Sequence, residues 1–261
     1  MRKEKASDFC DKSICPKNLT SHIGCNNPNT WAETCGTNLR IYRNTHAIVH
    51  YILRKHNIFR NIVAGRYLHK FPPSGRMLTM EWSTELARIA EWAAKRCTIS
   101  PPTECISTVQ YRNPGFNAAY NKFKGDQDIL KIVKSQLQSW YRENQWARAK
   151  SIENGVSKDS REIRHFLQLI IGEVDRIGCA ISRYTKEEWN HQLLVCIYSD
   201  SMKDFKKPVY QIDNKPASHC KCGVNQQFQN LCSRRESSNL ENTEKKHDSD
   251  LDMVELNTTK N

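Results

Sequence analysis

The distribution of cysteine along the chain is the feature that most limits what this sequence can fold into. There are 11 cysteines in 261 residues, and four of them lie within the first 35 positions. No two of them form a C-x-x-C pair, and only Cys220 and Cys222 are as close together as the paired ligands of a zinc knuckle. Clustered cysteines at this density are typical of a secreted chain that is crosslinked by disulfides, and we expect that arrangement here.

The N-terminal residues, MRKEKASDFC, are basic but are not followed by the apolar run of a signal peptide. Either a signal has been removed from this chain or the chain is cytosolic. Because the cysteines favour an oxidising compartment, the expectation is a secreted, extracellular protein whose signal peptide is absent from this chain. No stretch approaches the roughly 18 continuous apolar residues of a membrane-spanning helix, so a spanning protein is not expected.

The chain is strongly basic. Its formal net charge is +12, and residues 233–261 hold five basic and seven acidic residues, so residues 1–232 carry +14. A folded part with that charge attracts polyanions. No RNP, zinc-finger or helix-turn-helix motif is present, which favours glycosaminoglycans or an anionic cell surface over nucleic acid as partners. The alternative is a solvated surface that only aids solubility.

Three segments have the periodicity of amphipathic helices. The first begins after Thr45, a favourable N-cap residue, and stops at Gly65. The second lies within residues 80–97, where apolar residues recur at helical spacing from Leu86 to Cys97, and the third covers about 126–146. Trp82, Trp92, Trp140 and Trp146 fall in or beside these segments and are expected to form core or groove walls.

The remaining regular structure is predicted as a β-hairpin. Residues 176–184 and 189–199 are rich in β-branched and aromatic residues and are separated by a polar turn, so Cys179 and Cys196 would face each other. The expected organisation is a cysteine-rich extension over residues 1–44, a main domain over 45–212, a short cysteine-bearing segment over 213–232 and a disordered tail over 233–261.

Six short motifs occur in an order that matches one known family: HNIFRNIVAG, MEWSTELARIAEWAAKRC, SWYRE, RHFLQLI, IGCA and LLVCIY. Over roughly residues 45–212 the chain resembles the CAP superfamily, which comprises cysteine-rich secretory, antigen 5 and plant pathogenesis-related proteins. The flanks, DFCDKSICPKNLTSHIGCNNPNTWAETC and SHCKCGVNQQFQNLC, resemble those of fly-like insect antigen 5-related proteins.

The resemblance implies an α+β fold, a three-layer α-β-α sandwich with a central antiparallel sheet and disulfide-stapled extensions. It also implies the pairs Cys10–Cys25, Cys15–Cys105, Cys35–Cys97, Cys179–Cys196 and Cys220–Cys232, with Cys222 left unpaired. Sequence alone cannot choose this connectivity. The sequons at Asn18 and Asn257 are candidate glycosylation sites, and Asn18 is the better one because it lies in a plausible exposed loop.

Many family members hold a divalent metal with two histidines and two carboxylates, and the resemblance maps only half of that set onto this chain. Glu143 in SWYRE matches one acid and His165 in RHFLQ matches one histidine. The stretch from Cys97 to Cys105, where the other histidine is expected, contains none, and Phe116 stands where the second acid would be. Two ligands do not complete a zinc site, so no cofactor is expected. His165 is expected to be structural, hydrogen-bonded beneath Glu143.

These observations favour a non-enzymatic protein. No G-x-S-x-G or similar nucleophile motif accompanies Glu143 and His165. His46 and His50 are spaced i, i+4 and could bind metal, although a solvated or packed pair is the simpler interpretation. The expected function is that of a monomer which binds an extracellular protein or cell surface. The alternatives are a sterol or fatty-acid carrier and, third, a metal-dependent hydrolase.

Overall fold

The β5–β6 hairpin forms the centre of the fold. The structure, a computed structural model, describes residues 8–236 except 18, 20, 158 and 202–206. Strands β5 (Arg176–Lys186) and β6 (Trp189–Tyr198) are antiparallel, and Cys179 is paired with Cys196 as predicted. The sheet order is β1-β5-β6-β4, with β1 (Thr37–Arg43) and β4 (Gly115–Phe123) at its edges. The two-residue strand β3 (Glu81–Trp82) adds to β5 in parallel.

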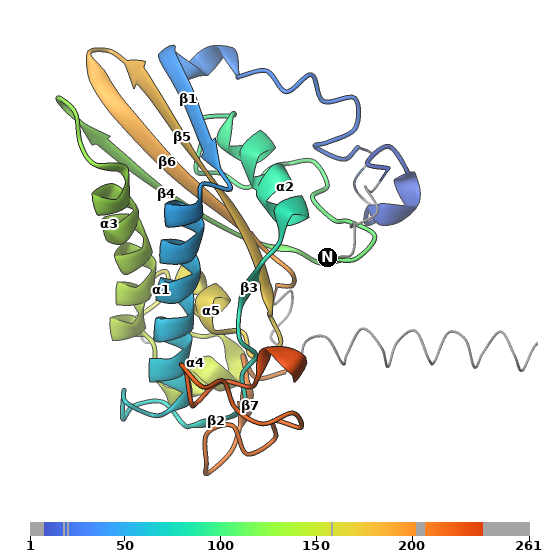
Figure 1. The fold of residues 1–261 in the computed structure, drawn as a ribbon, viewed down its shortest axis with the longest axis vertical. Coiled ribbons are helices and arrows are strands. Elements are labelled where there is room, and N and C mark those ends of the chain that lie inside the picture. The colour runs from blue at the N-terminus through green and yellow to red at the C-terminus, as the bar shows by residue number, and fades with distance from the viewer. Residues whose placement is uncertain (1–7, 18, 20, 158, 202–206, 237–261) are drawn as a thin grey trace, which may run out of the picture.

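Helices cover both faces of this sheet, which confirms the α-β-α sandwich (Figure 1). Helices α1 (His46–Ala64), α3 (Ile129–Arg142) and α5 (Arg164–Ile170) pack on one face, and α2 (Thr84–Ala94) packs on the other. The three predicted helices are thus present: α1 has the predicted bounds, whereas α2 and α3 are shorter than the segments predicted for them. The 3₁₀ helix η3 (Glu143–Trp146) continues α3 directly.

The short elements lie in the connections and the flanks. They are η1 (Lys12–Ile14), η2 (Glu33–Cys35), α4 (Ala149–Asn154), and the two-stranded sheet of β2 (Ser74–Arg76) and β7 (Gln211–Ile212). Among the residues that the structure describes, no helix is both long and apolar enough to cross a bilayer.

Two separate cores hold the layers together. The larger lies between the sheet and α1, α3 and α5, and includes Ile52, Trp140 and Phe166. The smaller lies beneath α2, which approaches the sheet closely at Gly178. A Cβ atom at that position would come within 2.0 Å of the backbone nitrogen of Ala87. Glycine is therefore required for α2 to pack on β5 at this distance.

Two strands are not predicted by the sequence analysis. Residues 37–43 lie in the predicted cysteine-rich extension, but in the structure they form β1 and pair with β5. Most of the β1 side chains are exposed, so the sequence lacks the alternation that reveals a half-buried strand. Strand β4 has the sequence GFNAAYNKF, in which glycine, asparagine, alanine and lysine are poor strand formers. Its pairing with β6 overrides that local preference.

Five disulfides join the pairs that the resemblance implies. Two of them, Cys15–Cys105 and Cys35–Cys97, fix the N-terminal extension to the region that follows α2. Cys222 is not part of these five disulfides and is half-buried near the C-terminal bridge. The sequons at Asn18 and Asn257, and residues 237–261 of the predicted tail, lie outside the described residues.

A fully buried arginine connects α1 to the loops beneath it. The Arg60 guanidinium donates hydrogen bonds to the carbonyl oxygens of residues 78, 169, 171, 172 and 174, at 2.8–3.2 Å. Burial lowers the pKa of Arg60 to about 10, so it stays charged at neutral pH. Charge-assisted bonds of this kind are stronger than neutral ones, and here they hold an irregular segment against the helix.

Candidate functional site

Glu143 and His165, the two residues that match the metal-binding set, are in contact. Glu143 opens η3 and His165 lies in the first turn of α5; the carboxylate Oε1 is 2.6 Å from the imidazole Nδ1. The second oxygen, Oε2, accepts a hydrogen bond from the backbone N–H of Phe166 at 3.0 Å. Both carboxylate oxygens are therefore used within the protein, and one of them satisfies a free N–H at the start of α5.

A chain of buried hydrogen bonds leads from this cluster into the core. Asn117 of β4 donates to the carbonyl oxygen of His165 at 3.1 Å and approaches the Tyr198 hydroxyl at 3.4 Å. The Tyr198 hydroxyl lies 3.0 Å from Nε2 of His56, and Nδ1 of His56 lies 2.8 Å from the carbonyl oxygen of Ile52. Because a carbonyl only accepts, Nδ1 of His56 carries the proton and Nε2 accepts from the tyrosine.

Burial shifts the titration of this chain. It lowers the pKa of His56 to about 4 and raises that of Tyr198 above its ordinary value. Both groups are neutral at physiological pH and act as fixed hydrogen-bonding partners. This chain of residues has no local sequence signal, since Asn117 and Tyr198 are 81 positions apart and His56 and Tyr198 are 142 positions apart.

The cleft formed by the neighbours of His165 on α5 is lined mostly by uncharged groups, and neither Glu143 nor His165 lines it. A cavity of about 250 Å³ lies between β4 and α5, with Phe116, Leu167 and Ile171 among its lining residues. Arg164 and Gln168 are the principal polar side chains there. No histidine and no carboxylate is among the described residues that line this cavity.

The donor set does not fit a divalent metal at this cleft. The oxygens of Glu143 are already engaged, and the charge of Arg164 at the cavity opposes a cation. The stretch from Cys97 to Cys105 offers Glu104, which is ion-paired with Arg96. A tetrahedral zinc site needs further nitrogen, sulfur or oxygen ligands, and the described part of the cleft does not provide them.

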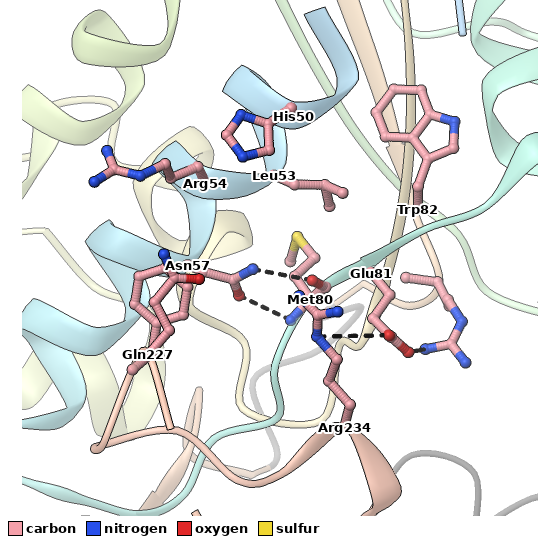
Figure 2. A pocket seen from close by; sticks show the side chains of 11 residues that line it. His50, Leu53, Arg54, Asn57, Met80, Glu81, Trp82, Gln227 and Arg234 are labelled. Atoms are coloured by element: carbon pink, nitrogen blue, oxygen red, sulfur yellow. Dashed lines mark hydrogen bonds and ion pairs between the residues drawn. The ribbon is translucent and has the colours of Figure 1, made fainter. Parts of the chain in front are cut away.

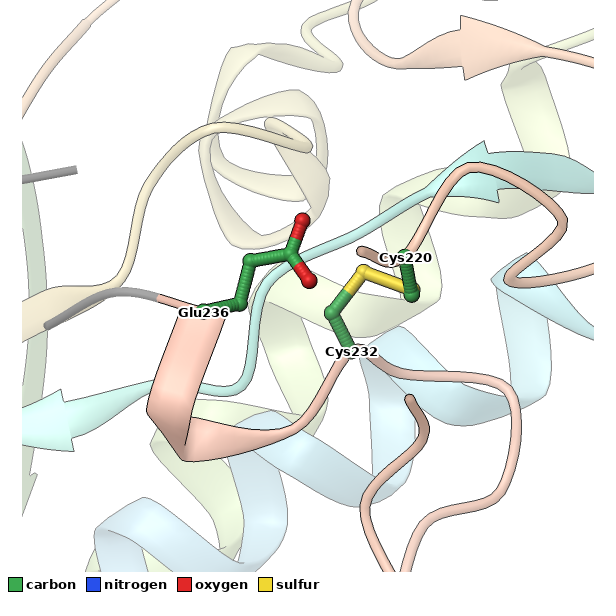
Figure 3. Close-up of side chains that lie close together, drawn as sticks. All are labelled: Cys220, Cys232 and Glu236. Carbon is green, nitrogen blue, oxygen red and sulfur yellow. A yellow bond between two sulfur atoms is a disulfide. The ribbon is translucent and has the colours of Figure 1, made fainter. Parts of the chain in front are cut away.

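One other group of ligand-type side chains lies within a small radius (Figure 3). It consists of Cys220, Cys232 and Glu236, but the two sulfur atoms are joined in a disulfide and are not thiolate ligands. Glu236 pairs instead with Arg76 at 3.1 Å and accepts from the backbone N–H of Cys222 at 3.0 Å. This cluster fastens the C-terminal segment to β2.

A larger cavity, of about 500 Å³, lies between α1, β3 and the C-terminal segment (Figure 2). Its polar residues include three arginines, Arg54, Arg176 and Arg234, beside one carboxylate, Glu81; Leu53, Met80 and Trp82 supply apolar surface. The Glu81 carboxylate binds Arg176 at 2.9 Å and lies 3.8 Å from Arg234. No local sequence pattern indicates this cavity, because its residues come from α1, from β3, from β5 and from the C-terminal segment, which are brought together only in the folded chain.

The remaining candidate residues are dispersed. His46 and His50 are exposed on the first turns of α1, with ring centroids 6.4 Å apart, and no third metal ligand lies near them among the described residues. Trp92 and Trp140 are buried in the two different cores. Trp82 and Trp146 are half-buried, and Trp82 donates a hydrogen bond to Asn44 at 2.8 Å.

Comparison with known proteins places this architecture in a family. Residues 53–198 match the model of the cysteine-rich secretory protein family, CAP. Venom allergen-1 of Aedes albopictus is 31% identical over 234 residues, which cover 88% of this chain and 89% of the relative. Tabinhibitin 3 of Tabanus yao is 26% identical, with 88% of each chain covered.

Solved structures show the same fold. The crystal structure of NaASP2 with Zn²⁺ is similar with a TM-score of 0.55 and 21% identity, covering 72% of this chain and 96% of that one. At that sequence identity the similarity shows a shared fold and nothing about function. The family match and the insect relatives agree with the sandwich, the motif order and the disulfides described above. The chain belongs to the cysteine-rich secretory protein (CAP) family, with antigen 5-type venom allergens of insects among its relatives.

Proposed function

We propose that this protein is a secreted, non-enzymatic binding protein that acts on an extracellular protein or cell surface. The observation that carries the proposal is the set of hydrogen bonds that the Glu143–His165 pair makes within the protein. Both carboxylate oxygens of Glu143 bind groups at the start of α5, so the pair serves to position that helix. A catalytic pair would in addition need a nucleophile and oxyanion donors aimed at a substrate, and the cavity beside it is lined by Phe116, Leu167 and Ile171.

The family match and the disulfides support the extracellular setting. The family is described as secretory, and five disulfides persist only where the surroundings are oxidising. The two insect relatives described above are a venom allergen and a tabinhibitin, and neither name describes an enzyme.

The binding role is tested with fluorescently labelled protein on a cultured cell layer with its extracellular matrix. We expect saturable binding of the native protein and of the His165→Ala variant, and loss of binding after reduction and alkylation of the disulfides. Non-saturable binding of native protein, equal to that of the reduced form, would overturn the proposal.

The non-enzymatic part is tested by metal analysis and by assays with ester and peptide substrates. We expect less than stoichiometric zinc after dialysis against zinc, and the same rate of hydrolysis for the native protein and His165→Ala. Stoichiometric zinc or a hydrolytic rate that His165→Ala abolishes would show that the cleft is a metal or catalytic site.

A carrier of sterol or fatty acid is the second candidate, and the apolar lining of the cleft favours it. The cavity of about 250 Å³ is below the 300–1,000 Å³ common for ligand pockets, so it would enclose only part of such a lipid. Displacement of a fluorescent sterol distinguishes the candidates. Saturable binding that Phe116→Glu abolishes supports the carrier, and the absence of saturable binding excludes it.

A further inference from the structure

Helices α1 and α3 contain no acidic residue. Together they comprise 33 residues, 19 in α1 and 14 in α3, and none is aspartate or glutamate. At the average of the chain, 28 acidic residues in 261, about three or four would occur in that length. The two helices lie side by side on the same face of the sheet (Figure 1). The stacked rings of Phe59 and Tyr141, whose centroids are 4.2 Å apart, join them.

The cations of these helices, apart from the buried Arg60, form what we name the α1–α3 basic face: Arg54, Lys55, Lys131, Lys134 and Arg142. All are exposed except Lys55, which is half-buried and lies over the ring of Tyr51. On α3, Lys131, Lys134 and Arg142 are spaced i, i+3 and i+11, which places them along the side opposite the buried Val133, Leu137 and Trp140. With a rise of about 1.5 Å per residue, they extend over about 16 Å.

No carboxylate of the described part of the chain pairs with a cation of this face. Among the described residues, none of its five cations forms an ion pair. The acids at the ends of α3 are engaged elsewhere. Asp128 caps the helix by accepting from the N–H of Lys131 at 2.7 Å, Asp126 lies 3.8 Å from Arg183, and Glu143 binds His165. Like charges held on two rigid helices without counter-ions produce a positive field that attracts a polyanion.

The apolar content of this surface indicates which class of polyanion can bind to it. The large hydrophobic side chains that are exposed in the described chain lie outside α1 and α3, at Leu39, Tyr67, Ile99, Val109, Tyr120, Val156, Ile212 and Val224. A membrane-surface helix needs apolar side chains that enter the lipid, and a single-stranded nucleic acid needs aromatic rings on which its bases stack. A face with cations and no exposed large hydrophobic residue fits a flexible, fully hydrated chain of negative charges.

We propose that the α1–α3 basic face binds a sulfated glycosaminoglycan. The sulfate groups would contact Lys131, Lys134 and Arg142 along α3, with Arg54 and Lys55 on the adjacent helix. This inference rests on the proposed function, because it names the surface and the chemical class of the extracellular partner. Binding of this kind holds the protein at a cell surface without any role for the Glu143–His165 cleft.

The test uses the full-length, disulfide-bonded protein on immobilised heparin. The face variant carries Lys131→Gln, Lys134→Gln and Arg142→Gln; the control carries Lys17→Gln, Lys215→Gln and Lys221→Gln, which are exposed cations of the terminal segments. Each variant loses three charges, so the net charge is matched. Circular dichroism and thermal unfolding verify that both remain folded.

We expect the face variant to bind heparin about tenfold more weakly than the native protein at physiological salt, and the control to change less than twofold. The slope of log K against log salt should decrease by about 2 in the face variant, since fewer counter-ions are released. Equal weakening in the two variants would show that only net charge matters and would overturn the inference.

Two further measurements separate the alternatives. Dextran, which is uncharged, should not compete with heparin, whereas dextran sulfate should. Vesicles of phosphatidylserine and phosphatidylcholine should bind less than heparin does, and tight vesicle binding that the face variant abolishes would assign the face to a membrane instead. The cell-layer assay is scored separately: if binding there survives in the face variant, the glycosaminoglycan inference fails while the binding function stands.

Discussion

At the scale of single residues, the carboxylate of Glu143 performs a helix-capping task. Helix α5 begins without a side-chain cap from its own N-cap residue, Ile163. Glu143 supplies the missing acceptor from another element, through its bond to the Phe166 N–H. A negative charge at that end is also favoured by the helix dipole. The residue that resembles a metal ligand thus has a structural reason to be present.

Replacing Glu143 tests this role. Glu143→Ala removes the acceptor of the Phe166 N–H and the partner of His165, and should lower the free energy of unfolding by about 2 kcal/mol. Glu143→Gln keeps an oxygen in place and should cost about half as much. Urea denaturation at pH 7 measures both. An alanine variant as stable as the native protein would show that the carboxylate does not hold α5.

The buried His56 makes the unfolding free energy depend on pH. Its pKa is about 4 in the folded protein and about 6.5 in an unfolded chain, so the unfolded state binds more protons between these values. Its contribution is fully present above pH 6.5 and falls by about 1.4 kcal/mol per pH unit as the pH decreases toward 4.

Comparison with His56→Gln isolates this contribution. Urea denaturation at pH 7, 6, 5 and 4.5 should give a stability difference between native and variant protein that shrinks steadily below pH 6.5, because only the native chain has this histidine to protonate on unfolding. A difference that is constant over this range would mean that His56 binds its proton as readily in the folded protein as in the unfolded chain, and that burial does not lower its pKa.

At the scale of elements, α1 is held by a polar anchor as well as by its apolar face. The carbonyl groups that Arg60 binds belong to Leu78, to Leu169 near the end of α5 and to the segment that joins α5 to β5. The segment from 171 to 175 is not part of a helix or strand; the carbonyl oxygens of Ile171 and Gly172 also accept backbone hydrogen bonds, from Val174 and Leu78, and the guanidinium supplements them. One long side chain supplies hydrogen bonds that secondary structure would otherwise provide.

Arg60→Met should therefore be strongly destabilising. The methionine fills part of the volume but leaves several buried carbonyl oxygens without a donor, and we expect a loss of about 3–5 kcal/mol. The exposed Arg54→Met, on the same helix, should change the stability by less than about 0.5 kcal/mol. Thermal unfolding of the two variants gives the comparison; similar melting temperatures would contradict the anchoring role.

At the scale of the whole molecule, the disulfides and the charge act on different parts. The bridges fix the cysteine-rich ends to the sandwich, and Cys179–Cys196 joins the two central strands. The charge is uneven: the face formed by α1 and α3 has no acid, whereas α2 on the opposite face contains Glu85 and Glu91. The disulfides therefore stabilise the terminal segments, whereas the cations that have no ion pair in the described part of the chain lie on another part of the molecule, the α1–α3 basic face.

Counting thiols checks this covalent arrangement. Under non-reducing, denaturing conditions the chain should react with about one equivalent of a maleimide, at Cys222, and reduction should release ten more thiols. Peptide mapping of the unreduced protein should recover the five pairs. Two or more reactive thiols before reduction would contradict the pairing, and none would show that Cys222 is bonded to another molecule.

Much of the fold could be predicted from the sequence, but less of the site. The periodic apolar residues of α1, α2 and α3 and the β-rich runs of the hairpin are local signals, and each was found. Strands β1 and β4 were missed because edge strands bury few side chains and gain their stability from hydrogen bonds to β5 and β6. The family resemblance predicts Glu143 and His165 and the hydrogen bond between them. It does not predict that Glu143 also accepts a hydrogen bond from the backbone N–H of Phe166.

The helices, the central hairpin, the cysteine-bridged character of the chain and its positive charge follow from residue type and short-range spacing, and they can therefore be inferred without the fold. How Arg60, His56 and Tyr198 satisfy their buried polar groups depends on the folded chain, since their partners are distant in the sequence. The tertiary structure also places α1 and α3 next to each other on one face of the sheet. Two helices without acids become a binding surface only when packing aligns them, because electrostatic attraction depends on distances in space.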